Sequence, residues 1–175
     1  GYNGHRVVKL DKDGRFVTAW GEPGEPGGKE TRPNYFNTVH GITVDPKTGT
    51  VYVSDRGNHR IQVFDQDGKF LRQWNVGQLT NLQFLIFASD GSGVWGFGDR
   101  VSKVAKWDTE GHLLYAWGLV GDTPGAFLNP HSASTDQEGN LYVAEVGNGR
   151  VQKFTPRAGA NPAFLVGPPV YAAWK

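Results

Sequence analysis

Two histidines, His40 and His131, stand at matching places in a sequence that repeats. Each lies five residues before an aspartate of a short turn, Asp45 in the first case and Asp136 in the second. Imidazole is a preferred ligand of zinc, and catalytic zinc sites combine three protein ligands with one open position. The matched histidines therefore indicate a metal site. A histidine that only makes structural hydrogen bonds is the alternative for each of them.

The repeating unit is clearest between Pro33 and Trp74. It contains four short apolar runs, HGITVD, TVYVSD, RIQVFD and KFLRQW, separated by turns rich in glycine, asparagine and aspartate. β-Branched and aromatic residues that alternate between such turns predict an antiparallel meander of four strands. One such unit buries little apolar surface, so it must stack against copies of itself.

The rest of the chain supplies those copies. We expect a half-blade at residues 1–21 and blades at about 33–75, 82–118 and 128–166, the last strand being degenerate near Ala163–Gly167. Equivalent basic residues recur at the spacing of β-propeller blades: Arg6, Arg60, Lys103 and Arg150. The fold class we predict is therefore all-β. Residues 1–175 would form a single partial propeller domain of four-stranded antiparallel blades, part of a six-bladed ring.

Three and a half blades do not close a ring. We expect the missing blades to come from sequence upstream of Gly1 or from another chain, and the half-blade at the start favours the upstream source. The alternative is a smaller ring, closed by pairing of residues 1–21 with the C-terminal strands. Residues 22–32 are polar and rich in proline and glycine, so we expect a loop without a strand there.

Propeller geometry places the loop that enters the first strand and the loop between the second and third strands on one face. His40 and His131 would lie on this face nearest the axis, and Tyr2, Asp55, Arg56 and Glu145 would lie on the same face. Asp55 would cap its loop or orient a ligand without touching it. The blade between the two histidines is expected to have Leu85 at their place. In a six-bladed ring, histidines in alternate blades would converge with a third one, expected upstream of Gly1.

Composition excludes several classes of partner. The chain has 18 lysines and arginines against 17 aspartates and glutamates, a formal net charge of +1. A strongly basic surface for nucleic acid or an anionic membrane is therefore not expected. No apolar run approaches the length of a membrane span, and the absence of cysteine excludes a disulfide framework. The partner we expect is a small-molecule or peptide substrate.

The motifs resemble those of a known family. N-x-R-[IV], as in Asn58-His59-Arg60-Ile61, looks like an NHL repeat. The segments GYNGHRV, VHGI, SDRGNHRIQVF and NPHS resemble, in order, the peptidyl-α-hydroxyglycine α-amidating lyases. Those enzymes are six-bladed propellers that cleave a C-terminal hydroxyglycine to a peptide amide and glyoxylate. The resemblance covers nearly the whole chain, as the C-terminal part of the family's catalytic core.

The resemblance implies roles for four residues. His40 and His131 would be zinc ligands, and Tyr2 would be the general base toward the substrate hydroxyl. Arg56 would line the site and bind substrate, which suits the fork of donors on a guanidinium group. In the animal enzymes an acidic residue linked to a structural calcium follows the last histidine. Ser132 stands there in this chain, so calcium is not expected.

The resemblance also implies export to the extracellular space or periplasm, with the signal peptide outside this chain, and the isolated fragment is expected to be inactive. Other functions stay open. The chain could be a non-enzymatic NHL propeller that binds a protein or other partner through its upper face. A lactonase-type hydrolase holding calcium is disfavoured by the histidines. Arg56, whose equivalent positions hold glycine or valine, could instead form a surface ion pair, and Tyr2 could simply pack on a neighbouring blade.

Overall fold

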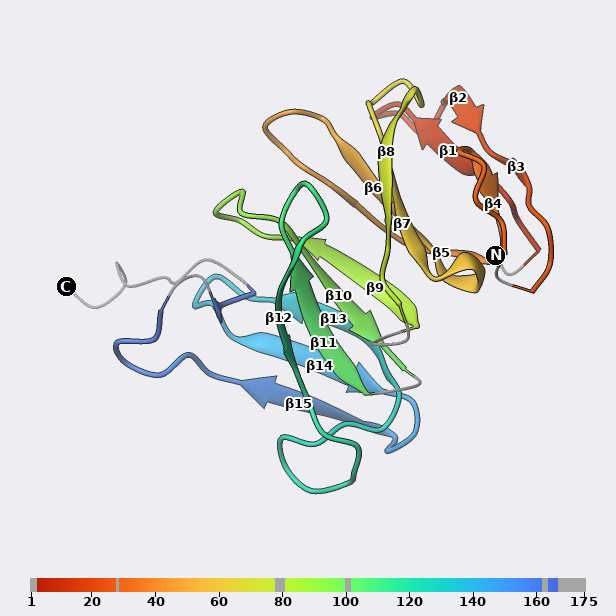
Figure 1. Cartoon of the computed structure of the whole chain (residues 1–175). Helices are drawn as coiled ribbons and strands as arrows, with labels where there is room; N and C mark the ends of the chain where they lie inside the picture. The colour runs from red at the N-terminus through yellow and green to blue at the C-terminus, as the bar shows by residue number, and fades with distance from the viewer. Residues whose placement is uncertain (1–2, 28, 78–80, 100–101, 162–163, 167–175) are drawn as a thin grey trace. The chain divides into compact units, whose positions relative to one another are not determined.

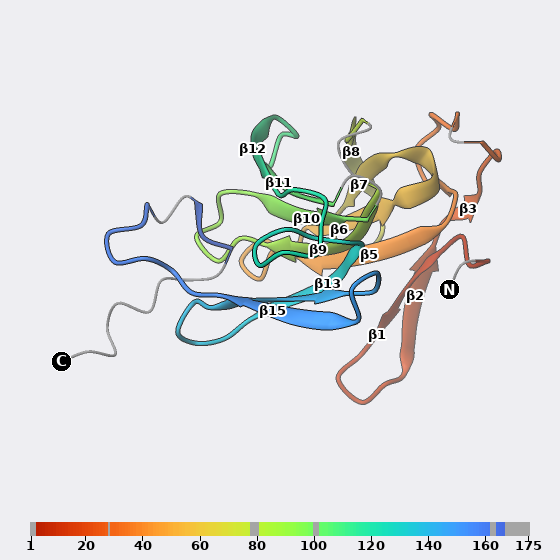
Figure 2. The same cartoon turned by 90° about the horizontal axis from the view of Figure 1, so that it is seen from below.

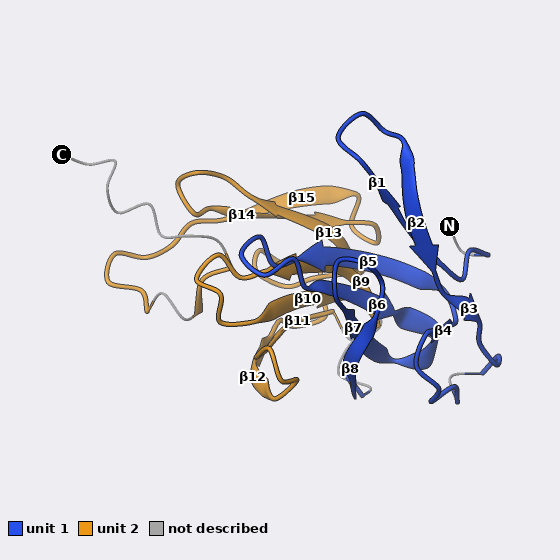
Figure 3. Cartoon of the chain, turned by 90° about the horizontal axis from the view of Figure 1, so that it is seen from above, with its two compact units in different colours: residues 1–78 blue, residues 79–175 orange. Residues whose placement is uncertain are grey.

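Figure 1 presents the computed structural model, which describes residues 3–27, 29–77, 81–99, 102–161 and 164–166. The regular structure is almost entirely β. The chain forms two compact units, residues 1–78 and 79–175, each with its own sheets and apolar core (Figure 3).

Unit 1 contains a two-stranded sheet, a four-stranded sheet and a short parallel pair. The strands are β1 (Val7–Leu10), β2 (Phe16–Trp20), β3 (Glu22–Pro23), β4 (Tyr35–Phe36), β5 (Val39–Val44), β6 (Val51–Asp55), β7 (Arg60–Phe64) and β8 (Phe70–Asn75). β1 pairs with β2, β3 pairs with β4, and β5 to β8 follow one another in a meander. The 3-10 turn η1 (Arg56–Asn58) joins β6 to β7.

Unit 2 contains a four-stranded and a three-stranded antiparallel meander. The first holds β9 (Leu82–Phe87), β10 (Val94–Gly98), β11 (Lys103–Trp107) and β12 (Leu113–Trp117). The second holds β13 (Pro130–Thr135), β14 (Leu141–Glu145) and β15 (Arg150–Phe154). The sheets pack with β9 and β13 next to each other (Figures 1 and 2), and residues from both build one core.

These sheets confirm the predicted all-β meanders and the register of their third strands. Two local predictions are wrong. Glu22–Pro23, expected to be loop, forms β3 and pairs in parallel with β4. Residues 164–166, expected to belong to a last strand, form none. Phe164 instead packs edge-on against Tyr115 with ring centroids 4.4 Å apart, and Val166 is buried in the core, so packing against the neighbouring sheet decides this segment.

Each unit repeats one aromatic contact between consecutive sheets. In unit 1 the Trp20 ring of the two-stranded sheet lies 5.7 Å from that of Phe64, which in turn lies 6.0 Å from Phe36. In unit 2 the Trp117 ring lies 5.6 Å from Phe154 and 5.4 Å from Phe127. Tilted and edge-on aromatic pairs of this kind stabilise packing beyond the area they bury. Trp20 and Trp117 therefore each pack against the apolar core of their unit, between consecutive sheets.

Aspartates close the hairpin turns by binding backbone N–H groups. Oδ1 of Asp65 accepts the N–H groups of Asp67 and Lys69 at 2.9 Å each, and Gly68 completes the turn with φ of 88°. The same arrangement recurs at Asp11, Asp108 and Asp136. The aspartate–glycine turns therefore have a structural role in closing the hairpins.

Within the described ranges no helix is long and apolar enough to span a membrane. A single propeller domain over residues 1–175 and the source of the missing blades stay predictions.

Candidate metal centre

His40 lies in a β-bulge at the start of the first strand of its sheet. Val39 pairs with Asp55, whereas the next regular pair joins Ile42 to Val53, so β5 carries one residue more than β6 across this step. The extra residue bends the strand and redirects the side chains around it. His40 is half-buried.

His131 occupies the corresponding bulge in the last sheet. Pro130 pairs with Glu145 and Ser132 pairs with Ala144, so β13 gains one residue at the histidine. His131 is also half-buried. The predicted equivalence of the two histidines therefore holds at the level of backbone pairing.

The blade between them has glutamine at this position, and the prediction of Leu85 is wrong. Leu82 pairs with Gly98 and Phe84 pairs with Phe97, which leaves Gln83 as the extra residue. The turn that follows begins at Ala88, whose N–H donates to the carbonyl of Gly93. Asp90, five residues after Leu85, therefore lies two residues inside the turn and does not begin it. Gln83 is almost fully buried, with 2% of its surface exposed.

Arg56 lies at the same end of the sheet as His40. It opens η1 directly after Asp55, the residue whose backbone pairs with Val39. The N–H of Gly57 donates to the carbonyl of Asn37 at 2.8 Å, which ties this loop to the segment before His40. Arg56 is half-buried, and β5 and η1 are in contact. The predicted shared face of these two residues therefore holds within unit 1.

The positions equivalent to Arg56 need one correction. Val146 takes its place in the last sheet and is 65% exposed. Because Gly98 pairs as Asp55 does, the middle sheet has Asp99 there, whereas glycine or valine was predicted.

Tyr2 lies outside the described residues, so its predicted role stays a prediction. Among the residues that the structure describes, no group of three or more histidine, cysteine, aspartate or glutamate side chains is arranged to hold a metal ion. A zinc site that uses His40 and His131 therefore needs a further ligand from elsewhere.

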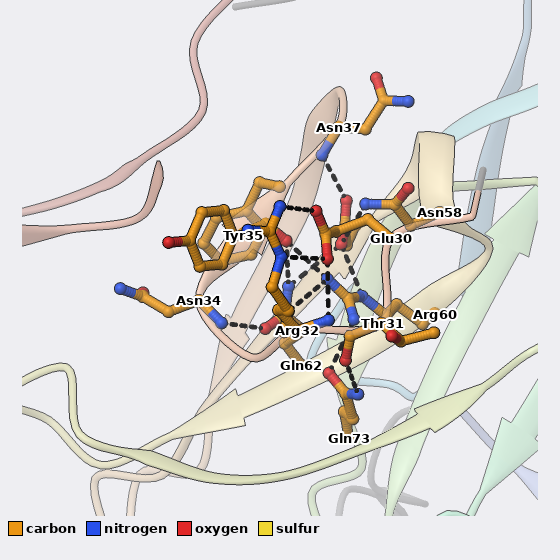
Figure 4. Close-up of polar contacts among 12 residues, drawn as sticks. Glu30, Thr31, Arg32, Asn34, Tyr35, Asn37, Asn58, Arg60, Gln62 and Gln73 are labelled. Carbon is orange, nitrogen blue, oxygen red and sulfur yellow. Dashed lines mark hydrogen bonds and ion pairs between the residues drawn. The ribbon is translucent and has the colours of Figure 1, made fainter. Parts of the chain in front are cut away.

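A buried carboxylate organises the histidine end of the unit 1 sheet. Asp55 has no exposed surface and accepts four hydrogen bonds. Its donors are the backbone N–H of Asn37 at 2.8 Å, Asn58 Nδ2 at 2.9 Å, Arg60 Nε at 2.7 Å and Gln62 Nε2 at 3.0 Å (Figure 4). Both carboxylate oxygens of Asp55 thus accept hydrogen bonds from the protein.

Arg60 extends the network to β4 and to the loop before it. Its Nη2 donates to the carbonyls of Tyr35 at 2.5 Å and Arg32 at 3.1 Å, and its Nη1 donates to Gln73 Oε1 at 3.0 Å (Figure 4). The recurring basic residue therefore has a structural role in this blade. Lys103, in the middle sheet, likewise donates to the carbonyl of Gly118.

Glu145 repeats the arrangement in the last sheet. It accepts the backbone N–H of Leu128 at 2.8 Å, Asn148 Nδ2 at 2.6 Å, Arg150 Nε at 2.8 Å and Gln152 Nε2 at 2.6 Å. Burial acts against its ionised form and is the largest single influence. The hydrogen bonds from Arg150, Leu128, Asn148 and Gln152 together still lower the pKa of Glu145.

The loop before β4 holds a second buried carboxylate, Glu30. Arg32 Nη2 donates to it at 2.6 Å, and the guanidinium also lies 3.9 Å from the centre of the Tyr35 ring. The side-chain hydrogen bond from Arg32 is the main cause that lowers the pKa of Glu30 to about 2. This ion pair and stack fix the loop whose Arg32 carbonyl accepts a hydrogen bond from Arg60.

The remaining histidines that the structure describes have structural positions. His5 Nδ1 lies 2.8 Å from the carbonyl of Phe36, and His112 Nδ1 lies 2.8 Å from Asp108 in an exposed turn. The backbone of His59 has a left-handed φ of 52° and ends η1.

Sequence reasoning placed Asp55 and Glu145 on the histidine face, but it missed the set of hydrogen-bond donors that the two carboxylates share. A signal was present, since an acidic residue is followed by asparagine, arginine and glutamine at the same offsets in two blades. The sets are Asp55, Asn58, Arg60 and Gln62 in one blade and Glu145, Asn148, Arg150 and Gln152 in the other.

Comparison with known proteins gives this architecture a family. The NHL repeat model matches residues 36–64 and 127–154, the segments that hold the two bulged histidines and the two carboxylates. The fold is similar to that of a solved streptogramin B lyase, with a TM-score of 0.62 and 18% identity over 90% of this chain and 50% of that one. The chain is an NHL-repeat propeller related to the amidating lyases.

Named relatives of this propeller include amidating proteins and an NHL repeat-containing protein. Rat peptidylglycine alpha-amidating monooxygenase is 29% identical over 163 residues, and the fruit fly peptidyl-alpha-hydroxyglycine alpha-amidating lyase 1 is 27% identical over 181 residues. These matches span 89% and 94% of the chain but only 16% and 34% of the relatives. Mouse NHL repeat-containing protein 3 is 34% identical over 170 residues, spanning 91% of the chain and 46% of the relative. The propeller described here therefore corresponds to less than half of each relative.

Proposed function

We propose that this chain forms part of a zinc-dependent lyase that cleaves a peptidyl-α-hydroxyglycine to a peptide amide and glyoxylate. The observation that carries the proposal is the placement of His40 and His131 in the same bulge of two blades, separated by a blade with Gln83. The similarity to the rat and fruit fly amidating proteins supports the reaction class.

The donor set fits the proposed metal. Both histidines are half-buried, and the strands β5 and β13 hold their backbone. Imidazole nitrogens are ordinary zinc ligands, and two of them with a third from the missing blades would leave a position for substrate. Zinc bound there would act as a Lewis acid toward the substrate hydroxyl. By resemblance, the protein would work outside the cytoplasm.

Arg56 would bind the substrate beside His40. A guanidinium group presents parallel donors that match a carboxylate or carbonyl group, and Arg56 lies at the end of the sheet where His40 stands. Tyr2 would accept the proton of the substrate hydroxyl. The ordinary phenol pKa is about 10, so a neighbouring positive charge such as Arg56 would have to lower it.

The bond changes of the proposed reaction balance without an oxidant. The hydroxyl of the hydroxyglycine carbon loses its proton and becomes the carbonyl of glyoxylate. The bond from that carbon to the amide nitrogen breaks, and the nitrogen takes its electron pair and gains a proton. The residues of this chain would orient the hydroxyl, hold the carboxylate and accept the hydroxyl proton.

Metal content and glyoxylate release test the proposal together, in the propeller completed by its missing blades. We expect stoichiometric zinc and glyoxylate release from a peptidyl-α-hydroxyglycine substrate, with both lost in His40→Ala and His131→Ala. His112→Ala, in an exposed turn, is the control and should keep both. A completed propeller that retains zinc but releases no glyoxylate would refute the reaction, and one that binds no zinc would refute the metal site.

A second candidate function is partner binding without catalysis. The match to mouse NHL repeat-containing protein 3 leaves this candidate open, because that name specifies no enzyme activity and its 34% identity exceeds that of the amidating relatives above. A completed propeller without metal that binds a protein partner through the face of His40 and Arg56 would support this candidate over the lyase.

A further inference from the structure

The buried carboxylates reach the backbone just before each histidine. Asp55 Oδ1 accepts the N–H of Asn37, and Glu145 Oε2 accepts the N–H of Leu128, both at 2.8 Å. Asn37 and Leu128 each stand three residues before the histidine of their blade. The two blades thus use the same bond at the same offset, although one carboxylate has a longer side chain.

The loop that follows each carboxylate binds the carbonyl group of the same residue, Asn37 or Leu128. Gly57 N–H donates to the carbonyl of Asn37 at 2.8 Å, and Gly147 N–H donates to the carbonyl of Leu128 at 3.1 Å. No larger residue fits at either place, because a Cβ on Gly57 would lie 2.6 Å from the Asn37 carbonyl oxygen and one on Gly147 would lie 2.5 Å from Leu128 Cγ. The N–H and carbonyl of Asn37 and of Leu128 are therefore both held.

The held segment contains an unusual backbone conformation. Thr38 has a φ of 58° and Asn129 has a φ of 54°, each two residues before a histidine. Left-handed backbone is sparsely populated for a β-branched residue such as threonine. Such conformations persist only where the surroundings enforce them. The carboxylate and the glycine loop are the surroundings that do so here, and the bulge with the histidine follows directly.

The carboxylates themselves cannot easily move. Asp55 is held by three buried side-chain donors, Asn58, Arg60 and Gln62, of which none is more than 4% exposed. The side-chain donors to Glu145 are of the same three types. Charge-assisted hydrogen bonds of this kind fix both position and orientation.

The middle blade shows what happens when the carboxylate is displaced. Gly98 stands at the position of Asp55, and the acidic residue is Asp99, one place later. Asp99 accepts the side-chain amides of Asn81 and Gln83. In this blade the carboxylate binds the side chain of the bulged residue, Gln83. In the histidine blades it binds the backbone before the bulge instead.

We propose that Asp55 and Glu145 are positioning residues, each of which orients the histidine of its own sheet, His40 or His131, for ligand binding without touching the ligand. This inference rests on the zinc site proposed above, and it assigns the carboxylates a role beyond holding the blade together. Groups that orient metal-binding histidines in this indirect way commonly alter metal affinity 10–100-fold when they are changed.

Three variants of unit 1 test the proposal. Asp55→Asn removes the charge at nearly constant shape. Asp65→Asn is the control, because Asp65 also accepts two backbone N–H groups but closes the turn at the other end of the same sheet. Asp55→Glu is the conservative variant, since a glutamate fills the role in the last sheet.

Two measurements are made on each protein well below its unfolding temperature. The first is the NMR signal of the His40 ring in the metal-free chain, assigned with His40→Ala. The second is the affinity for zinc chloride of the completed propeller. We expect Asp55→Asn to shift or split the His40 signal and to weaken zinc binding by about tenfold or more. Asp65→Asn should change neither, and Asp55→Glu should restore at least part of both.

An unchanged His40 signal and zinc affinity in folded Asp55→Asn would overturn the positioning role while leaving the zinc site intact. If the unaltered propeller binds no zinc, the proposed function fails, and the His40 signal alone still decides whether Asp55 orients the ring. If Asp55→Asn does not fold, Glu145→Gln decides the matter through the signal of His131, with Asp108→Asn, in a turn of unit 2, as its control.

Discussion

Arg60 donates its Nε to Asp55 at 2.7 Å, and both side chains are almost completely withdrawn from water. The pair joins β6 to β7 at the end of the sheet where His40 lies. Arg60 also donates to the carbonyls of Arg32 and Tyr35. This basic residue, which recurs in the repeats, therefore joins the segment before β5 to the carboxylate at the histidine end of the sheet.

Replacing Arg60 with alanine should therefore be severely destabilising. The change leaves the Asp55 charge buried without its counter-ion, for which a loss of about 3–5 kcal/mol in the free energy of unfolding is typical. Denaturant unfolding measures it. Arg15→Ala, which removes an exposed ion pair with Asp13, should cost less than about 1 kcal/mol. Equal effects of the two substitutions would contradict the role assigned to Arg60.

Glu30 should make stability depend on pH in the acid range. Its folded-state pKa of about 2 lies below the ordinary 4.5, so its ionised form stabilises the fold above pH 4.5. This contribution is lost as the pH falls from 4.5 to about 2. Glu30→Gln should lower the melting temperature at pH 6, and the difference from the unaltered protein should shrink across that window. Glu22→Gln, on an exposed residue of the nearby strand β3, is the control and should leave the melting temperature at pH 6 nearly unchanged.

Zinc should stabilise the completed propeller through its histidines. At a free zinc concentration of 100 times the dissociation constant, the free energy of unfolding should rise by about 2.7 kcal/mol. His40→Ala and His131→Ala should abolish this gain, and a chelator should reverse it in the unaltered protein. Thermal unfolding with and without zinc measures the effect. A gain that survives both substitutions would place the metal elsewhere.

Trp20 should matter more to stability than its neighbour Phe16 on the same strand. Trp20 packs against Phe64 of the next sheet, whereas Phe16 is 68% exposed. Trp20→Ala should cost about 2 kcal/mol or more in the free energy of unfolding, and Phe16→Ala about 0.5 kcal/mol or less. Unfolding of both variants in urea gives the comparison. Similar losses would mean that this aromatic contact between sheets contributes little.

The sequence by itself determined the strands, the turns and the periodic scaffold. Alternation with a period of two and turns such as Asp67–Gly68 depend on residues close in the chain, so they can be recognised without a partner strand. The equivalence of His40 and His131 was also readable, because both hairpins begin with an aspartate that accepts the N–H two residues on.

Only the tertiary structure decided which residue shares their register in the middle blade and what holds the histidines in place. The residue equivalent to the histidines is Gln83 and not the predicted Leu85, because strand pairing sets the register and the distance to an aspartate does not. Asp55 lies 18 residues from the N–H of Asn37 that it binds, and Glu145 lies 17 residues from that of Leu128. Such contacts arise only when the sheet brings distant segments together, so they follow from the fold and not from local pattern.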